Sequence, residues 1–577
     1  MIVLGIHAGP HDASAALFDE YRVVGAVQLE RLTRVKNAGV DRALWAWPCV
    51  DELLSMAGLA RRDVDAVALT RAAFPRAHYR KMRTPLRRIA SAVSSSQAKK
   101  RPTKLLDQAM RSARLLDPDA VFDARGFLAA SGFRGDVRID WCNHHFAHVL
   151  PSLFFTDWSE ALLYSVDGIG DNVSYSAHSF RDGRIATLFG GDESLLAPYR
   201  ADSIGFAYAL VTKALGFRMF RHEGKITALA AHGEPALYDS LAPHFRVAAD
   251  GQVRSDWTTI PEMEAGLLAL VDGQRREDIA ASIQKLLEDV VLESVARLLA
   301  RHPHRRLGLS GGVAANVKLN RHLAERAGVD EIFVVPPMGD EGLSLGAALS
   351  LLLRRDGLAR WLDGRYRLDG VFWGRDYDGA IDRALAGAPG IVRTDAPPAE
   401  GAAQRLADGA IGAIYQGRME FGPRALGARS ILANPSRRAT HDELNRRLSR
   451  TEFMPFAPVI AEERAREVFD VGPVNAYACR FMTITTDVRP EWRSRIEAVV
   501  HVDGSARPQI VARAQNPLYY DILAAFERRT GLPAMINTSF NVHEEPIVNG
   551  PAECVRALAD GRIDFVVTKE ALYARAG

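Results

Sequence analysis

The feature that most constrains the fold is a strand–turn–strand pattern that occurs twice in the N-terminal half. The first copy consists of an apolar run at 1–6, a turn with Gly9 and Pro10, and a second run at 14–18. The second copy spans 161–180, where two runs flank the turn DGIGD. Runs of this kind around a glycine turn predict β-hairpins. Their recurrence predicts an internal duplication of nucleotide-handling lobes.

The segment after these hairpins predicts an α/β alternation. Over 277–301 the apolar residues follow helical spacing and predict one buried stripe. The stripe consists of Ile279, Ile283, Leu286, Leu287, Val290, Val291, Val295 and Leu298. Strands are expected at 306–309 and 331–337, the second followed by a helix rich in Ala and Leu.

A charged, glycine-containing stretch at 354–375 predicts a linker. We therefore place a domain boundary near residue 365, with a first domain at 1–365 and a second α/β domain at 366–577. At 577 residues the chain is long enough for two or more domains.

Composition narrows the class of protein. Apolar residues make up 47% and charged residues 25%, as in soluble globular proteins, and the net charge of +3 is too small to favour nucleic acid as a partner. The four cysteines form no CxxC pair, so neither a disulfide framework nor a structural zinc site is expected, and a reducing cytoplasm fits best. Neither a signal peptide nor a membrane-spanning helix is expected from the N-terminal sequence and the apolar runs.

One segment, 76–101, contains nine Lys and Arg residues and no acidic residue. It is either a solvated surface excursion or a basic rim that attracts an anionic acceptor or a membrane surface.

A metal site is suggested by the motif NHHFAH. His144 and His148 are four residues apart, which on a helix places both imidazoles on one face. Asp340, expected at the end of a strand, is the candidate third ligand. Two histidines and a carboxylate suit a divalent metal with open positions, although two unrelated histidines would give the same spacing.

Two glycine-rich turns are candidate nucleotide contacts. DGIGD contains Asp167, Gly168, Gly170 and Asp171, and glycine lets backbone N–H groups approach a phosphate closely. SGGVAAN follows a strand and opens a helix, so an adenosine could lie against its backbone; its candidates are Gly311, Gly312 and Asn316. Neither turn matches GxxxxGK[ST] or GxGxxG, and each could be a purely structural turn.

The ordered motifs identify a family. HDASA, NHHFAH, SVDGIGD, HEGKITALAAHG, GLSGGVAAN and PPMGDEGLSLGAA are followed by GPRALGARSILANP, RTEFMPFAP, HVDGSARPQ and INTSFNVHEEPIV. Together they resemble the NodU/CmcH family of O-carbamoyltransferases over nearly the whole chain.

The resemblance implies a duplicated actin-like ATPase domain followed by a domain like the YrdC-type threonylcarbamoyl-adenylate synthases. In such proteins the C-terminal domain makes carbamoyl-adenylate from ATP and carbamoyl phosphate. The adenylate then moves to the N-terminal domain, which transfers the carbamoyl group to a hydroxyl beside a metal. The implied cofactors are ATP with Mg²⁺ and a divalent metal, expected to be Fe(II).

The second domain supplies cations for the carbamoyl phosphate dianion. The candidates are Arg418, Arg424, Arg450 and Arg507, with Asn537 and Ser539 as polar partners. The alternative is that these arginines lie on solvated faces and bind no ligand. Arginines within glycine and proline turns fit this alternative less well. Related chains often carry Lys before the MPFAP stretch, where this chain has Leu448-Ser449-Arg450-Thr451.

Three further residues follow from the resemblance. His11 and Asp12 in HDASA correspond to the acceptor pocket, where His11 could take the proton of the acceptor hydroxyl. Lys225 in HEGK could reach the nucleotide phosphates. A turn-stabilising histidine and a surface lysine are the alternatives.

The resulting hypothesis is an ATP-dependent O-carbamoyltransferase acting on a natural product or glycan. The alternatives are a tRNA threonylcarbamoyl transferase-like enzyme, for which 76–101 would contact RNA, and a non-catalytic actin-like nucleotide-binding protein or sugar kinase. The four scattered cysteines exclude the zinc fingers of a hydrogenase-maturation carbamoyltransferase. The sequence leaves the acceptor, the metal and the oligomeric state open.

Overall fold

The N-terminal half contains two five-stranded sheets of the same design. The computed structural model describes residues 1–40, 45–70, 78, 122–196, 200–449 and 456–576. The segment 76–101, except His78, and Arg450 therefore lie outside the described residues. The strand order is β3-β2-β1-β4-β5 in the first sheet and β8-β7-β6-β11-β12 in the second.

Strand direction is repeated as well as strand order. In the first sheet β3 (Arg22–Gln28), β2 (Ser14–Asp19) and β1 (Ile2–His7) are antiparallel. β4 (Ala66–Thr70) and β5 (Arg138–Cys142) then continue parallel to β1.

The second sheet repeats this with β8 (Arg184–Phe189), β7 (Val173–Arg181) and β6 (Ala161–Gly170), again antiparallel. β11 (Arg306–Ser310) and β12 (Glu331–Val334) follow parallel to β6. The duplication expected from the two hairpins is therefore present in the strands.

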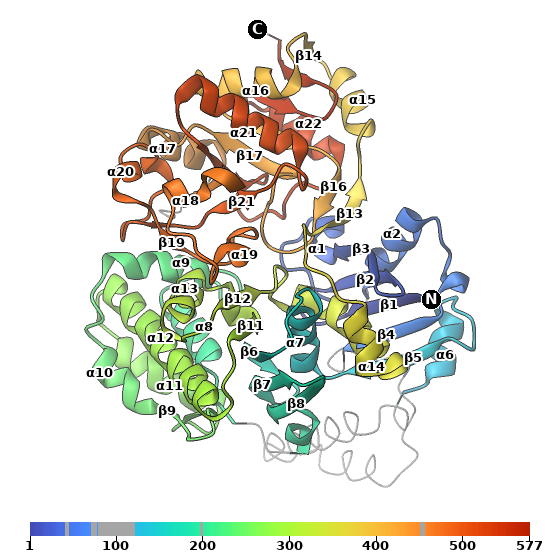
Figure 1. Ribbon diagram of the computed structural model, residues 1–577, viewed down its shortest axis with the longest axis vertical. Helices are drawn as coiled ribbons and strands as arrows, with labels where there is room; N and C mark the ends of the chain where they lie inside the picture. Colours follow the sequence, from blue (N-terminus) through green and yellow to red (C-terminus); the bar gives the residue numbers. More distant parts are fainter. Residues whose placement is uncertain (41–44, 71–77, 79–121, 197–199, 450–455, 577) are drawn as a thin grey trace, which may run out of the picture.

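Two helices lie between the sheets and pack on each other. α7 (His144–Phe154) packs on the second sheet and α14 (Leu343–Asp363) on the first (Figure 1). A Cβ at Gly346 would lie 1.8 Å from the Ala147 carbonyl oxygen, and one at Gly5 would lie 2.0 Å from that of Ser344. Glycine is therefore needed where α14 meets α7 and β1. The close packing brings the N-terminal ends of both helices together.

The outer face of the second sheet is covered by a helical layer. α12 (Arg276–Arg301) confirms the predicted helix, and every residue of its apolar stripe is buried. α8 (Ile204–Ala214), α9 (Glu223–Leu229) and α11 (Ile260–Val271) pack around α12 or α8.

The chain from β14 onward builds an eight-stranded mixed sheet, ordered β14-β24-β23-β15-β17-β22-β18-β21. The strands are β14 (Ile391–Thr394), β24 (Leu572–Arg575), β23 (Phe565–Val567), β15 (Gly412–Tyr415), β17 (Arg429–Ala433), β22 (Ala534–Ser539), β18 (Ala457–Ala461) and β21 (Gln509–Val511). α16 (Pro398–Ala407) packs closely on α21 (Pro517–Thr530) beside this sheet.

The protein is thus of the α/β class. The linker expected over 354–375 begins later than predicted. α14 is interrupted at Gly357, which has a φ of 78°, but helical residues resume after it and continue as far as Asp363. The boundary near 365 remains a prediction.

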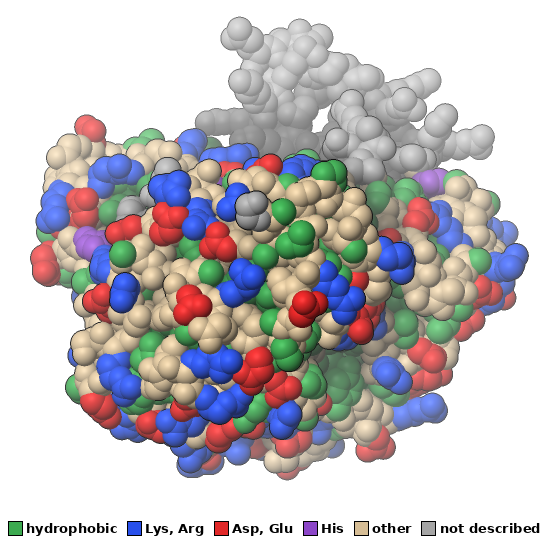
Figure 2. Space-filling view, turned by 90° about the horizontal axis from the view of Figure 1, so that it is seen from above, with side chains coloured by type: hydrophobic (Ala, Val, Ile, Leu, Met, Phe, Trp, Pro, Cys, Tyr) green, Lys and Arg blue, Asp and Glu red, His purple; other side chains and the backbone are tan. Residues whose placement is uncertain are grey.

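None of the helices in the described residues is long and apolar enough to cross a membrane. On the face seen in Figure 2, the basic and acidic side chains of the described residues are interspersed.

Candidate metal centre and shared cavity

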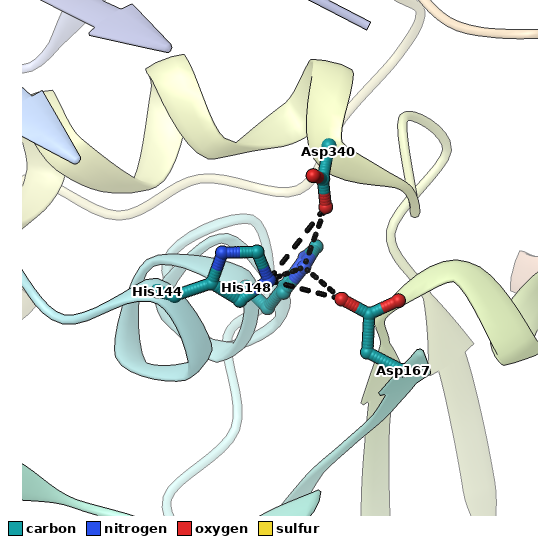
Figure 3. Close-up of side chains that lie close together, drawn as sticks. All are labelled: His144, His148, Asp167 and Asp340. Atoms are coloured by element: carbon teal, nitrogen blue, oxygen red, sulfur yellow. Dashed lines mark hydrogen bonds and ion pairs between the residues drawn. The ribbon is translucent and has the colours of Figure 1, made fainter. Parts of the chain in front are cut away.

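Four side chains converge where α7, α14 and β6 meet. His144 and His148 come from the first turns of α7, Asp167 from β6, and Asp340 from the turn before α14 (Figure 3). Their ligand atoms all lie within 4.8 Å of one another. The Nε2 atoms of the two histidines are 3.2 Å apart. Asp167 Oδ2 lies 2.9 Å from Nε2 of His144 and 3.4 Å from that of His148.

The end of β6 and the hairpin turn that follows it brace His144. A Cβ at Gly170 would lie 2.1 Å from Cδ2 of His144, so glycine leaves room for that imidazole. The Asp171 carboxylate accepts a hydrogen bond of 2.7 Å from the backbone N–H of His144. The turn DGIGD therefore positions the first helical histidine, a role that sequence reasoning did not assign to it.

The donor set fits a divalent metal. Two imidazole nitrogens and two carboxylate oxygens, nearly all buried, point at one another, and this combination suits a borderline divalent cation. Burial lowers the pKa of His148, but hydrogen bonds to Asp167 and Asp340 outweigh it and raise the pKa to about 9. The two carboxyl groups are also buried, yet the histidines hold the pKa of each below its usual range. A cation bound here would replace protons on the imidazoles.

The structure adds Asp167 to the three predicted ligands. We expected this residue to contact nucleotide phosphates. Its Oδ1 accepts a hydrogen bond of 3.1 Å from the Gly312 N–H, while Oδ2 faces the histidines. Asp167 therefore joins the candidate metal centre to the second glycine-rich turn.

His7 is a neighbour that sequence reasoning missed. Its Nε2 lies 3.6 Å from Asp340 Oδ2, and its Nδ1 lies 3.0 Å from the Thr70 hydroxyl. Burial lowers its pKa to about 4, which keeps the imidazole neutral at pH 7. The sequence contained an indication of this position, because His7 and His11 flank the same turn.

His11 and Asp12 lie beside the cluster, and their place in an acceptor pocket remains a prediction. His11 Nδ1 is 3.1 Å from Asp12 Oδ2 and 3.9 Å from Asp340 Oδ2. Burial lowers the pKa of His11, but the carboxylates of Asp12 and Asp340 raise it to about 9.

One cavity of about 430 Å³ borders the cluster and reaches into the C-terminal part. It is lined by these predicted residues: His11, Asp12, Asp167, Gly168, Gly312, Asn316, Asp340, Arg424 and Ser539. The sequence hypothesis had an adenylate travelling between two domain sites. In the structure, candidates from the N-terminal and the C-terminal parts of the chain line a common cavity.

The second glycine-rich turn needs its glycines. Gly311 has a φ of 90°, and a Cβ there would lie 2.3 Å from the Val166 carbonyl oxygen. Asn316 caps α13 (Val317–Arg326) by accepting from the Leu319 N–H, and its amide donates to Gln284 over 2.9 Å. Asn316 therefore has a structural role as a helix cap, and a contact with a ligand would come in addition to it.

Other predicted residues do not line this cavity. Arg418 donates to the carbonyl oxygens of Val24, Trp373 and Gly374 at 2.6–2.9 Å. Asn537 donates to Gln509 and to the Ala425 carbonyl oxygen. The structure thus gives both side chains polar partners within the protein.

Lys225, on α9, lies with its ammonium 5.7 Å from the centre of the Phe217 ring. It too is absent from the cavity lining.

Arg507 is buried close enough to Arg424 for the two charges to repel each other. Burial lowers the pKa of Arg507 well below its usual value, and the charge of Arg424 lowers it further. Burial also lowers the pKa of Arg424, to about 10, and the described residues provide no hydrogen-bond partner for its buried Nε. No salt bridge joins Arg507 to an acidic residue in the described part of the chain. Two adjacent guanidinium groups with this environment favour an anion as their ligand.

Comparisons with known proteins identify the family of this chain. Family profiles described as carbamoyltransferase N-terminus and carbamoyltransferase C-terminus match residues 2–349 and 403–575. The chain belongs to the carbamoyltransferase family.

Curated relatives extend over most of the carbamoyltransferase chain. It is 33% identical to nodulation protein NolNO of Sinorhizobium fredii, covering 96% of this chain and 78% of the relative. It is 28% identical to nodulation protein U of Rhizobium tropici, covering 82% and 80%. A solved structure of full-length HypF in a phosphate- and nucleotide-bound form covers 62% of this chain and 47% of HypF, at 12% identity and a TM-score of 0.37. At this TM-score the likeness supports no conclusion beyond the strand order described above.

Proposed function

We propose that this carbamoyltransferase is an ATP-dependent O-carbamoyltransferase that uses carbamoyl phosphate and passes through carbamoyl-adenylate. In this proposal the N-terminal domain is actin-like, and the C-terminal domain resembles the YrdC-type adenylate synthases. The observation that carries it is the common cavity, where the His/Asp cluster, a glycine-rich turn and Arg424 meet.

The first half-reaction takes place at the arginines. Arg424, Arg507 and Arg450 offset the charge of carbamoyl phosphate, and the Ser539 hydroxyl orients it. Water cleaves the P–O bond to give carbamate and inorganic phosphate. A carbamate oxygen then attacks the α-phosphorus of ATP, and pyrophosphate leaves with the electrons of the broken P–O bond. Because the cavity is shared, the carbamoyl-adenylate need not pass through bulk water.

In the second half-reaction the nucleotide lies against Gly168 and Gly312, and the acceptor hydroxyl attacks the carbamoyl carbon. The departing group is AMP. His11 takes the hydroxyl proton, and it must be neutral before it can do so. The carboxylates of Asp12 and Asp340 raise the pKa of His11. A cation bound beside them would offset part of their charge and so lower this pKa. His144, His148, Asp167 and Asp340 would hold a divalent metal, expected to be Fe(II), which would supply stabilisation of negative charge during the transfer.

The acceptor is proposed to be a hydroxyl of a natural product or glycan. The two alternatives from the sequence differ in what they consume. A tRNA threonylcarbamoyl transferase-like enzyme requires RNA, and a non-catalytic actin-like protein or a sugar kinase does not release pyrophosphate.

The test is pyrophosphate release from ATP by the metal-loaded full chain, with and without carbamoyl phosphate. Release that requires carbamoyl phosphate, followed by a carbamoyl mass gain on a candidate acceptor, supports the proposal. ATP turnover that is indifferent to carbamoyl phosphate contradicts it.

A further inference from the structure

A short helix of the first domain contacts the second domain on the edge of the cavity. α1 (Leu29–Thr33) follows β3 directly and lies where the first sheet meets the C-terminal part (Figure 1). Gln28, Arg31 and Arg34 recur every three residues, and each makes a hydrogen bond to the C-terminal part. Gln28 and Arg31 also line the cavity.

Arg31 and Gln28 hold the loop that carries Arg424. Arg31 donates a hydrogen bond of 2.7 Å to the Gly422 carbonyl oxygen, and the Gly422 N–H donates to Gln28 Oε1 over 3.2 Å. Arg31 also donates to Gln28 Oε1, so the two side chains brace each other. Both are 4% exposed. Gly422 has a φ of 119°, a conformation that favours glycine.

The other end of this loop is fixed within the second domain. The buried carboxylate of Glu420 accepts hydrogen bonds from the backbone N–H groups of Leu426, Ala428 and Arg429, at 2.7–3.1 Å. Arg424 therefore sits in a loop held at one end by Glu420 and at the other by Arg31 and Gln28. Glu420 belongs to the second domain, whereas Arg31 and Gln28 belong to the first.

Arg34 holds the segment that follows Ser539. It donates to the carbonyl oxygens of Pro546 and Ile547 at 2.8 Å, and its Nε pairs with Glu553 at 2.7 Å. Pro546 and Ile547 line the cavity together with Ser539. α1 thus reaches both cavity-lining loops of the second domain.

We propose that Arg31 and Arg34 are positioning residues for the carbamoyl phosphate step. They hold the loop that presents Arg424 and the segment that follows Ser539, the last residue of β22, so the first domain takes part in building the anion site of the second. The inference rests on the proposed function for its ligand, carbamoyl phosphate. Hydrogen bonds from a charged donor are strong, and misplacing a contact residue by about 1 Å has a large effect on binding and rate.

The test is calorimetric binding of freshly dissolved carbamoyl phosphate to the full chain, which needs no turnover. The Arg31→Ala/Arg34→Ala double variant should bind it at least about tenfold more weakly than wild type. Arg34→Ala alone should also weaken binding, and because Arg34 is partly exposed this variant is the safer one to fold. Arg31→Lys, which keeps the charge and can still donate to Gly422, should bind more tightly than Arg31→Ala.

Arg375→Ala is the matched control. Arg375 pairs with Glu52 of α2 (Trp47–Ala57) across the same two parts of the chain, and its exposure of 27% is close to the 28% of Arg34. It does not line the cavity. The control should bind carbamoyl phosphate as wild type does, and all variants should keep the metal content of wild type. In turnover, the KM for carbamoyl phosphate should rise in the α1 variants more than the KM for ATP.

Three results would overturn the inference: no binding of carbamoyl phosphate by wild type, equal binding by Arg34→Ala and wild type, or equal weakening in Arg375→Ala. A wild type that binds carbamoyl phosphate but releases no pyrophosphate would instead contradict the proposed function, while the binding data would still decide the role of α1.

Discussion

Asp167 has two roles in the structure: it faces the two imidazoles of the cluster, and it accepts a hydrogen bond from the second glycine-rich turn. Replacing it with asparagine separates these roles. In Asp167→Asn the amide oxygen can still accept from the Gly312 N–H, now 3.1 Å from Oδ1, so the glycine-rich turn keeps its contact. The charge opposite the two imidazoles is lost. The Asp167 side chain is 13% exposed and those of His144 and His148 are 3% and 1% exposed, so water can compensate little.

The expected cost follows from this burial. Removing one partner of a buried charge pair costs about 3–5 kcal/mol of interaction free energy, and we expect a similar loss for a buried carboxylate that faces a bound cation. The lower end corresponds to a weakening of metal binding of about 100-fold. The assay is elemental analysis after dialysis at fixed free metal, followed by competition with a chelator to obtain the Kd. Asp171→Asn is the control, since Asp171 contacts His144 only through the backbone N–H in the hydrogen bonds described.

The Asp171→Asn variant should keep most of its metal, while His148→Ala should lose it. A wild-type Kd for metal in Asp167→Asn, alongside metal loss in His148→Ala, would remove Asp167 from the ligand set. Unchanged metal content in both variants would falsify the metal centre itself.

The other predictions concern the anion site, the brace of α7 and the domain contact. Arg507→Ala and Ser539→Ala should each lower carbamoyl-phosphate-dependent pyrophosphate release by about 10-fold or more, through loss of a charge-assisted contact, while metal content persists; unchanged release would show that the anion site is elsewhere. Gly170→Ala should displace His144 and reduce bound metal, because the new Cβ would lie 2.1 Å from its ring. Glu544 joins the C-terminal part to the N-terminal part, because its carboxylate lies 2.8 Å from His222 Nε2 and 2.6 Å from an Arg221 guanidinium nitrogen. Burial raises the pKa of Glu544, but the hydrogen bond with His222 and the charges of Arg221, His222 and His543 outweigh this and hold the pKa below its usual range. Its stabilising effect should be full above its unfolded pKa near 4.5 and lost as pH falls through the lower folded value, so the Tm difference between wild type and Glu544→Gln should shrink below about pH 4.5; a constant difference would contradict this.

Much of the fold could be predicted because the patterns are local. The two hairpins and the apolar stripe of α12 depend on periodicity over a few turns or strands, and the structure contains all of them. The end of α14 could not be placed, because charged residues at 354–363 are compatible with both a solvated helix face and a linker. Tertiary packing decides between them, as Trp361 is fully buried.

The site was predictable only where the ligands share one element or one motif. His144 and His148 follow from helical spacing. Asp167 was recognised, but its second oxygen points at residues far away in the chain, which no spacing reveals. The common cavity was missed for the same reason: it depends on how Arg424 and Ser539 of the second domain meet Asp340 of the first.

The contacts that α1 makes have a consequence for how such a chain can diverge. Arg31 and Arg34 donate mainly to main-chain carbonyl oxygens, at Gly422, Pro546 and Ile547. A carbonyl acceptor persists whichever side chain its residue carries, so substitutions at Pro546 or Ile547 need no matching change in α1. Apart from the ion pair of Arg34 with Glu553, this contact would therefore not appear as correlated substitutions between homologues. A chimera that joined the first domain of one family member to the second domain of another would need the two arginines, Glu553 and the glycine at 422, but could tolerate variation at positions 546 and 547.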